Sequence, residues 1–329
     1  MKLAAFTSGD ITMASSRLRS FYIFKSNAWK DHEVVFNPNI YSINSFDWLH
    51  IQKMYAPRYI LLAIYARLMG KFIIFDLDDE NTKLSHRIAI FIMFKISNIV
   101  ACDSELKQKY FIKKYNKKNI TVIPEPMDVE EQNISTKKIS RFTGNQFIKK
   151  TKSVILWVGN VENFISFKSL IELDERFFDY EIIVITDIST PTIVELNHPN
   201  YKIKQWSINW IDDIDFSNRY FMLLNHNDKT NINSSKKNEN KMVMAIYNQI
   251  IPIVSNTYYY SELARNLNAE FLVFNEGEYP YDLINNLENK DSEWLEDFFE
   301  KTSNFIEVNY NRDLFGLKLL SIYQNSSSY

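Results

Sequence analysis

The sequence is poor in cysteine, glycine and proline. Its single cysteine, Cys102, has no partner for a disulfide within this chain and excludes a zinc site built from several cysteines. Only 6 glycines and 8 prolines occur among 329 residues, so few flexible linkers are expected. By contrast, 46% of the residues are hydrophobic and 15% are aromatic, as in proteins with well-packed cores. Length and composition together predict two globular domains.

Long hydrophobic runs are also missing. The two longest apolar stretches, "YILLAIYARLMG" and "RIAIFIMFKISNIVA", are shorter than a membrane span and contain Arg67 and Lys95. The apolar patch in "MKLAAFTSGD" is too brief for the core of a secretory signal. We therefore expect core helices, a buried first strand and a cytoplasmic protein.

Positive charge is unevenly distributed. Residues 1–150 contain 23 Lys and Arg against 14 Asp and Glu (+9), while residues 151–329 contain 15 against 26 (−11). A basic half attracts nucleic acid, an anionic membrane or a phosphorylated acceptor, although solvated lysines would give the same count. We expect peripheral contact with the inner face of the cell membrane and no nucleic-acid partner. In this prediction, Tyr110, Phe111 and Tyr115 of "KQKYFIKKYNKK" enter the lipid interface.

Apolar strand-like runs alternate with helical patterns along the chain, a rhythm typical of parallel sheets covered by helices. A polar segment without a period separates two such series. The prediction is an α/β protein with two doubly wound domains, at 1–148 and 149–310, and a last helix at 311–329 that packs back on the first domain. Expected strands are 2–6, 32–36, 47–52, 72–76, 98–102, 119–124, 153–160, 180–187, 201–206, 219–225 and 250–256. Expected helices are 57–69, 84–96, one from 104, 167–178 and 240–248, and the tail over 291–324 is expected to be helical.

Open parallel sheets bind ligands at the carboxyl ends of their strands, so the residues after each apolar run are candidates. After the first run come Gly9 and Asp10, then Ser16, Arg17 and Arg19 in "SSRLR". A glycine lets a ligand approach the backbone, and an arginine grips a phosphate or carboxylate through two hydrogen bonds. A structural turn with surface arginines is the alternative.

The same rule finds candidates in the second half. Gly159 and Asn160 follow "SVILWV", Thr186 and Asp187 follow "EIIVI", and Trp206 follows "YKIKQ". They offer backbone and hydroxyl donors for a phosphate, a carboxylate or amide for a ribose or base, and an aromatic face for stacking. Together they predict a nucleotide site.

The strongest local signal is "NENKMVMAIYNQIIPIVSNTYYYSELA". Lys241, after Asn240, stands at the start of a predicted helix, where its charge and the amide donors suit a diphosphate. Tyr260, Ser261 and Glu262 lie in the loop after the next strand, where a second helix start would face the same pocket. A solvated lysine and a tyrosine-rich loop are the alternative.

In "GKFIIFDLDDENTK" an apolar run ends in Asp76, Asp78 and Asp79. Clustered carboxylates repel one another, so they usually bind a cation, take part in a proton transfer or accept hydrogen bonds from a partner. Three uses compete: a metal site, the Asp76 and Asp78 pair of a haloacid dehalogenase-type phosphatase, or the rim of a sugar-nucleotide cleft. Capping of the following helix would explain at least one of them. The phosphatase motif normally has Thr or Val where Glu80 stands.

With these residues the chain resembles bacterial GT-B glycosyltransferases, especially the retaining, nucleotide-sugar-dependent enzymes of family four that build surface polysaccharides. The resemblance spans most of the chain, through "SSRLR", "LHIQK" before "GKFIIFDLDD", "ACDSELKQKYF" with "NITVIPEPMD", "ILWVGN", "IKQW" and "NKMVMAIYNQIIPIVSNTYYYSELA". Two departures stand out. Lys237 and Ala245 occupy the region where the family has a glutamate pair, and Gln249 and Ile250 precede Pro252 where it has a glycine.

The resemblance implies two Rossmann-like domains facing across a cleft. It also implies transfer of a sugar from a nucleoside diphosphate sugar to a cell-surface glycan or lipid-linked precursor, without a metal or other cofactor. A non-catalytic GT-B-like binding protein and the phosphatase remain the alternatives. The implied roles are catalysis by Arg17, Asp78 and Asp79, acceptor binding by Gly9, Asp10, Ser16 and Arg19, and donor binding by Gly159, Asn160, Thr186, Asp187, Trp206, Asn240, Lys241, Tyr260, Ser261 and Glu262, with Glu262 replacing the absent ribose-binding glutamate.

Overall fold

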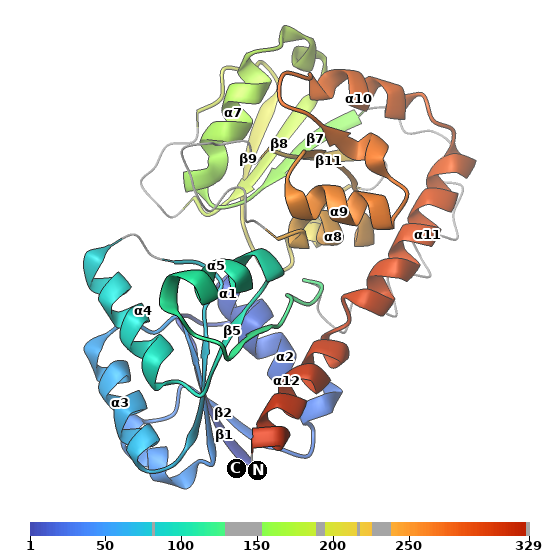
Figure 1. Ribbon diagram of the computed structural model, residues 1–329. Helices are drawn as coiled ribbons and strands as arrows, with labels where there is room; N and C mark the ends of the chain where they lie inside the picture. Colours follow the sequence, from blue (N-terminus) through green and yellow to red (C-terminus); the bar gives the residue numbers. More distant parts are fainter. Residues whose placement is uncertain (81–82, 129–152, 189–194, 216–217, 226–237, 327–329) are drawn as a thin grey trace. The chain divides into compact units, whose positions relative to one another are not determined.

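The computed structural model describes residues 1–80, 83–128, 153–188, 195–215, 218–225 and 238–326. The chain forms two compact units, and Figure 1 colours it from the N-terminus to the C-terminus. Unit 1 comprises Met1–Met127 together with Asn309–Tyr329, and unit 2 comprises Asp128–Val308. The end of the chain therefore belongs to the first unit. The predicted boundary after residue 148 lies outside the described residues.

Unit 1 is built on a six-stranded parallel sheet. Its central strands are short apolar runs buried on both faces, as is typical of parallel sheets. The register pairs Leu3 of the first strand with Trp48, and Ile51 with Phe75. In spatial order the strands are β2 (Glu33–Phe36), β1 (Lys2–Phe6), β3 (Trp48–Gln52), β4 (Phe72–Asp76), β5 (Ile99–Cys102) and β6 (Ile120–Val122).

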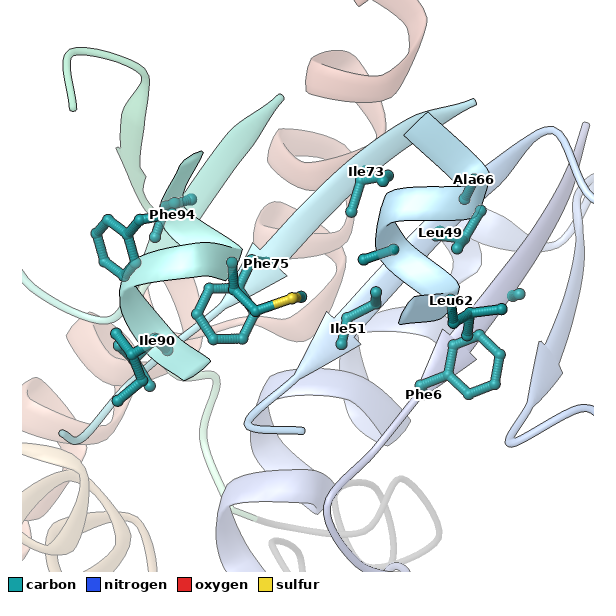
Figure 2. Packing of buried hydrophobic residues seen from close by; sticks show 14 of the residues in the cluster. Phe6, Leu49, Ile51, Leu62, Ala66, Ile73, Phe75, Ile90 and Phe94 are labelled. Carbon is teal, nitrogen blue, oxygen red and sulfur yellow. The ribbon is translucent and has the colours of Figure 1, made fainter. Parts of the chain in front are cut away.

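Three helices cover one face of this sheet. Figure 2 shows Ile51 and Phe75 of the strands in one cluster with Leu62, Ile90 and Phe94 of the helices, and all five are buried. Each large apolar side chain buried in this way contributes about 1.5–3 kcal/mol. The helices are α3 (Pro57–Leu68), α4 (Leu84–Ile96) and α5 (Glu105–Tyr115).

The first helix and the last helix of the chain cover the opposite face. The ring of Tyr323 stacks on Trp48 with centroids 4.7 Å apart, and its hydroxyl donates to the Leu49 carbonyl oxygen at 3.2 Å. Trp29 Nε1 donates to the Gly316 carbonyl oxygen at 3.1 Å. The elements on this face are α1 (Ala14–Ser16), which continues through a π-helical segment (Arg17–Phe21) into α2 (Tyr22–Phe24), the 3₁₀ turn Asn27–Trp29, and α12 (Arg312–Ser326).

Unit 2 repeats this plan on a second six-stranded parallel sheet. In spatial order its strands are β12 (Val273–Phe274), β11 (Ile251–Ser255), β10 (Arg219–Leu224), β7 (Ser153–Val158), β8 (Glu181–Thr186) and β9 (Tyr201–Gln205). Its helices are α7 (Phe164–Glu172), α8 (Asn240–Tyr247), α9 (Tyr258–Asn266), α10 (Pro280–Glu288) and α11 (Ser292–Asn309).

The predicted α/β fold with two doubly wound halves is confirmed. The predicted helix over 167–178 is wrong at both ends, since α7 begins at Phe164 and ends at Glu172. The reason is Asp174, whose side chain accepts from the Arg176 amide at 3.1 Å and starts a separate 3₁₀ turn. The predicted helical tail consists of two helices, α11 and α12, and α12 lies within the range expected for the last helix.

Gly316 allows α12 to lie close to the beginning of the chain. A Cβ atom at this position would lie 2.1 Å from Ser26 Oγ, which is held by its hydrogen bond to the Ile23 carbonyl oxygen. We predict that Gly316→Ala lowers the free energy of unfolding by about 1–3 kcal/mol, because overpacking outweighs the roughly 1 kcal/mol gain in helix propensity. Denaturant unfolding measures this, with the exposed Leu317→Ala as control. Unchanged stability of Gly316→Ala would contradict the packing argument.

Candidate functional site

The strand orders place a topological switch point in each sheet. In unit 2 the chain runs from β7 to one side through β8 and β9, and then continues on the other side with β10. In unit 1 the same reversal occurs between β1 and β3. Connections diverge at such a point, which opens a crevice outside the carboxyl ends of the strands. Each unit therefore has one candidate site at this edge.

At the unit 2 edge, the start of α8 reaches the end of β7. Lys241 Nζ donates to the Val158 carbonyl oxygen at 2.6 Å and lies 5.7 Å from the Trp157 ring centroid. A Cβ atom at Gly159 would lie 2.9 Å from both Lys241 Nζ and the Trp157 ring, so glycine gives this lysine its space. Asn240, which precedes the lysine, is buried. The structure thus brings Gly159 and Lys241 together at the start of α8.

The next two strand ends carry a hydroxyl, a carboxylate and an indole. Thr186 is buried at the end of β8, its carbonyl oxygen accepts from the Trp206 amide at 2.8 Å, and its Oγ1 has no hydrogen-bond partner among the described residues. Asp187 is exposed and accepts from Gln205 Nε2 at 3.3 Å. Trp206 is half-buried and follows the neighbouring strand β9. The predicted Thr186, Asp187 and Trp206 therefore lie on adjacent strands.

A pair of residues that sequence reasoning missed links β10 to α7 at the switch point. Asn225 Nδ2 donates to the Ser166 carbonyl oxygen at 3.1 Å, and Ser166 Oγ donates to the Asn225 carbonyl oxygen at 3.1 Å. The carbonyl oxygen of Asn160 accepts from the Asn163 amide at 2.9 Å, which forms the turn before α7. Asn225 directly follows an apolar run, so the strand-end rule could have found it.

The start of α9 separates three predicted residues by their exposure. Tyr260 is buried, and burial together with the nearby carboxylate of Glu239 raises the pKa of its phenol. Ser261 is half-buried, and its Oγ donates to Asn256 Oδ1 at 2.6 Å. Glu262 is half-buried as well. Tyr260 thus belongs to the core, while Ser261 and Glu262 reach the surface.

At the unit 1 edge, a hydrogen-bond network joins β1 to β3. Ser16 Oγ accepts from the Gly9 amide at 3.1 Å and donates to Gln52 Oε1 at 3.2 Å, which also accepts from the Ser8 amide at 3.1 Å. Gln52 Nε2 is buried without a hydrogen-bond partner among the described residues. The predicted Gly9 and Ser16 are therefore together at the switch point, beside a buried amide donor. Gln52 was missed, although it ends an apolar run.

Arg17 and Asp10 shape the loop after β1. Arg17 is buried, and its Nη1 donates to the carbonyl oxygens of Ile11 and Thr12 at 3.0 Å each. Asp10 is exposed, and its Oδ1 accepts from the hydroxyl and the amide of Thr12, which lower the pKa of this carboxyl. In this structure the guanidinium of Arg17 holds the loop that borders the switch point.

A buried ion pair lies beneath this edge. Arg19 Nε lies 2.8 Å from Asp76 Oδ1, and its Nη1 donates to the Ile123 carbonyl oxygen at 2.6 Å. His50 Nε2 lies 3.4 Å from Asp76 Oδ2. Burial opposes ionisation of Asp76, but the charge of Arg19 and the nearby imidazole of His50 outweigh it, so the pKa of this carboxyl is lowered. Arg19, a predicted acceptor ligand, therefore lies in the core.

Asp78 and Asp79 form ion pairs with two lysines that the sequence analysis did not identify. Lys53 Nζ lies 2.5 Å from Asp78 Oδ1 and 4.0 Å from Asp79 Oδ2. Lys107 Nζ lies 3.4 Å from Asp79 Oδ1 and 2.7 Å from Asp103 Oδ2. Burial opposes the charge of Lys53, but Asp78 and Asp79 outweigh it and raise the pKa of the ammonium. The result is a chain of alternating charges across the ends of β3, β4 and β5.

The capping interpretation of the aspartates is wrong. Helix α4 begins at Leu84 after Lys83, without an acidic residue in its first turn and without a side-chain cap. Glu80 accepts from Lys114 Nζ at 2.6 Å and from Tyr110 Oη at 2.9 Å, so it anchors α5. Asp76 is enclosed by Arg19 and His50, which leaves a phosphatase nucleophile at this position without support. In the described part of the chain, no group of three or more His, Cys, Asp or Glu could hold a metal ion.

The Arg19–Asp76 pair gives a pH-dependent prediction. Arg19→Met leaves a buried carboxylate unpaired and should lower the free energy of unfolding by about 3–5 kcal/mol at neutral pH. The lowered pKa of Asp76 means that the pair stabilises the protein above the ordinary pKa of a carboxyl, and that this contribution is lost as pH falls through the lowered value. In Arg19→Met, burial raises the pKa of Asp76, so the stability gap to the natural protein should narrow on acidification.

Denaturant unfolding at several pH values measures this gap. Arg19→Met/Asp76→Asn should recover much of the loss, because neither member of the pair is then charged. Arg58→Met, at an exposed arginine of α3, is the control and should change stability by less than about 0.5 kcal/mol. A gap that widens toward low pH would contradict the assignment.

Comparison with known proteins gives matches in structure. No family model matches the sequence, and no curated protein matches it. HepE of Anabaena, solved in complex with UDP-glucose, is 13% identical with a TM-score of 0.62, over 99% of this chain and 100% of that one. An α-glucosyltransferase solved with UDP-glucose and DNA containing an abasic site is 12% identical, with a TM-score of 0.63 over 98% and 99%.

WaaG, a glycosyltransferase involved in lipopolysaccharide biosynthesis, is 10% identical with a TM-score of 0.58, over 98% of this chain and 99% of that one. Identities this low establish the fold alone. Both six-stranded parallel sheets and their flanking helices take part in these alignments, which span nearly the whole chain. The chain therefore has the GT-B fold, as its sequence predicted.

Proposed function

We propose that this protein is a glycosyltransferase that moves a sugar from a nucleoside diphosphate sugar to a cell-surface glycan or its lipid-linked precursor. The observation that carries the proposal is the meeting of Lys241, Gly159 and Trp157 at the switch point of the second sheet. It supplies a cation, a close backbone approach and an aromatic surface at one strand end. UDP or UDP-glucose is bound in the solved structures of HepE, and UDP-glucose in that of the α-glucosyltransferase.

In the proposed donor site, six of the predicted residues bind different parts of the nucleotide. Lys241 and the start of α8 bind the diphosphate, and Gly159 with Asn160 brings the backbone of β7 close to it. Asp187 and Glu262 bind the ribose hydroxyls in this proposal, and Trp206 is the stacking surface for the base.

In the proposed reaction, an acceptor hydroxyl oxygen bonds to the anomeric carbon while the bond from that carbon to the diphosphate oxygen breaks, and the hydroxyl proton passes to the departing diphosphate. The diphosphate leaves with the bonding electrons, so its negative charge rises. Lys241 offsets that charge, a preorganised electrostatic role that requires neither a metal nor another cofactor. We propose retention of the anomeric configuration, without a side-chain nucleophile.

The acceptor side of the proposal uses the unit 1 edge. Asp79 is the more exposed of the paired aspartates, and it bridges Lys53 and Lys107. A carboxylate fixed by two lysines can accept hydrogen bonds from sugar hydroxyls without changing its position. Asp78, held by Lys53, supports this arrangement.

The direct test combines calorimetry with a transfer assay on a panel of UDP-, GDP- and TDP-sugars. Tight binding of one donor, followed by its turnover or slow hydrolysis, supports the proposal. Binding without any turnover would instead support a GT-B-like binding protein. Release of phosphate from small phosphomonoesters in the presence of Mg²⁺, without donor binding, would support the phosphatase.

Lys241→Ala should weaken binding of the best nucleoside diphosphate by roughly 1.5–3 kcal/mol, because it removes a charge-assisted contact. Calorimetry measures the change, and unfolding curves check that the variant is folded. Lys202→Ala is the matched control, since Lys202 pairs with Glu181 near the opposite edge of the same sheet. If Lys241→Ala and the natural protein bind the nucleoside diphosphate with equal affinity, the assignment of Lys241 to the donor site is wrong.

Metal independence is a separate prediction. Asp78 and Asp79 are neutralised by lysines in the structure, so sugar transfer should continue in excess EDTA. The measurement is the transfer rate before and after chelation, with Mn²⁺ and Mg²⁺ added back. Loss of transfer in EDTA and its rescue by Mn²⁺ would mean that these aspartates hold a cation.

A further inference from the structure

Helices α3 and α4 each expose a row of apolar side chains. Leu61 and Leu68 of α3 are 66% and 80% exposed, and Leu84, Ile88 and Phe91 of α4 are 72%, 55% and 50% exposed. Spacings of three, four and seven residues put each set on one side of its helix, together with the exposed Ile64. We call these six side chains the α3–α4 face.

The apolar residues of this face are additional to those the core requires. On the other side of α3, Leu62, Ala63 and Ala66 are buried, and on α4 Ile90 and Met93 are buried. Most soluble helices are polar on the side away from the core. The two helices pack side by side, as Figure 1 also shows, so their outer sides form one continuous surface. Exposed apolar surface of this extent marks an interaction site.

The charged side chains of α3, α4 and the residues at their ends are all positive. Residues 57–71 contain three basic side chains and residues 83–98 contain three more, and neither segment contains Asp or Glu. Lys95 Nζ lies 5.6 Å from the ring centroid of Phe91, at the border of the face. The positive side chains are Arg58, Arg67, Lys71, Lys83, Arg87 and Lys95.

The positive charge distinguishes between two possible partners of this face, a second copy of the chain and a lipid surface. A second copy of the chain packed symmetrically on it would bring the six cations toward six more, which is unfavourable. Large aliphatic and aromatic side chains on helices that carry Lys and Arg but no acidic residue match the boundary between anionic headgroups and acyl chains. Among the described residues no helix is long and apolar enough to cross a membrane.

We propose that the α3–α4 face docks the protein on an anionic lipid surface. This replaces the predicted contact through residues 107–118. Phe111 and Tyr115 are buried in the core, and Tyr110 is held by Glu80, so these rings cannot enter a lipid interface.

The location of the face would serve an acceptor carried by a lipid. Helices α3 and α4 begin shortly after the carboxyl ends of β3 and β4, where Gln52 and Asp79 lie. The face therefore starts at the same edge of the sheet as the acceptor residues proposed above. Docking itself does not depend on the transfer reaction, so the two proposals can fail separately.

The test is co-sedimentation of the full chain with vesicles of phosphatidylcholine containing phosphatidylglycerol, and with vesicles of phosphatidylcholine alone. The natural protein should sediment with the anionic vesicles at low salt and much less with the neutral ones. Leu68→Glu/Leu84→Glu should weaken its partitioning by about a hundredfold, since two leucines leave the interface and two negative charges approach it. Arg67→Gln/Lys95→Gln should weaken it by about tenfold.

Leu173→Glu/Val308→Glu is the matched control, because these two residues are 77% and 71% exposed on unit 2. Its partitioning should stay within about twofold of the natural protein. Unfolding curves and nucleotide calorimetry confirm that each variant is folded, independently of lipid binding. The proposal is overturned if the natural protein stays in the supernatant, if the control pair loses binding equally, or if Leu68→Glu/Leu84→Glu only converts a dimer to a monomer.

Discussion

Parallel strands that are covered on both faces leave room for polar side chains only at their ends. In this protein β1, β3, β4, β7, β8 and β10 are buried along most of their length, and helices cover both faces of the first sheet. The polar residues are therefore gathered at the strand ends, where connections to helices diverge. Both candidate sites are consequences of this one constraint, and the switch points decide where along each edge they form.

The ion pair between Asp76 and Arg19 is an exception, because it lies inside the covered part of the sheet. Burying its two charges costs free energy. A carboxylate at the last position of β4 faces the side covered by α2 and α12, where Phe24 packs against the ring of His50. The negative charge of Asp76 is stable there because the π-helical segment after α1 places the guanidinium of Arg19 beside it. The helix that follows the first strand is thus tied to the middle of the sheet, and the loop before it inherits a fixed position beside Gln52.

The two units share a plan but differ in how they end. Unit 1 takes its last helix from the far end of the chain, so Trp29 and Tyr323, from opposite ends of the sequence, share one core. Unit 2 ends in α11 before this return. The outer sides of α3 and α4 distinguish unit 1 further, because they are apolar where a solvent-facing side is ordinarily polar.

The sequence determined the layout of the fold. Apolar runs marked the strands, and the helical patterns over 57–69 and 84–96 marked two helices, because local backbone preference and burial agree there. The strand-end rule likewise placed Gly159 and Thr186 at one edge, since parallel strands bring all their carboxyl ends together.

Tertiary structure alone decided which polar groups are paired and which side chains are covered. Gln249 occupies the region where the resembled family has glycine and still adopts a left-handed φ of 58°, which its sequence does not reveal. Arg19 looked like a surface ligand and is a core cation, and the partners of Asp78 and Asp79 are lysines that follow other strands. The physical reason is that the energy of a charge depends on its burial and on its neighbours in space, and both are supplied by segments that are distant in sequence.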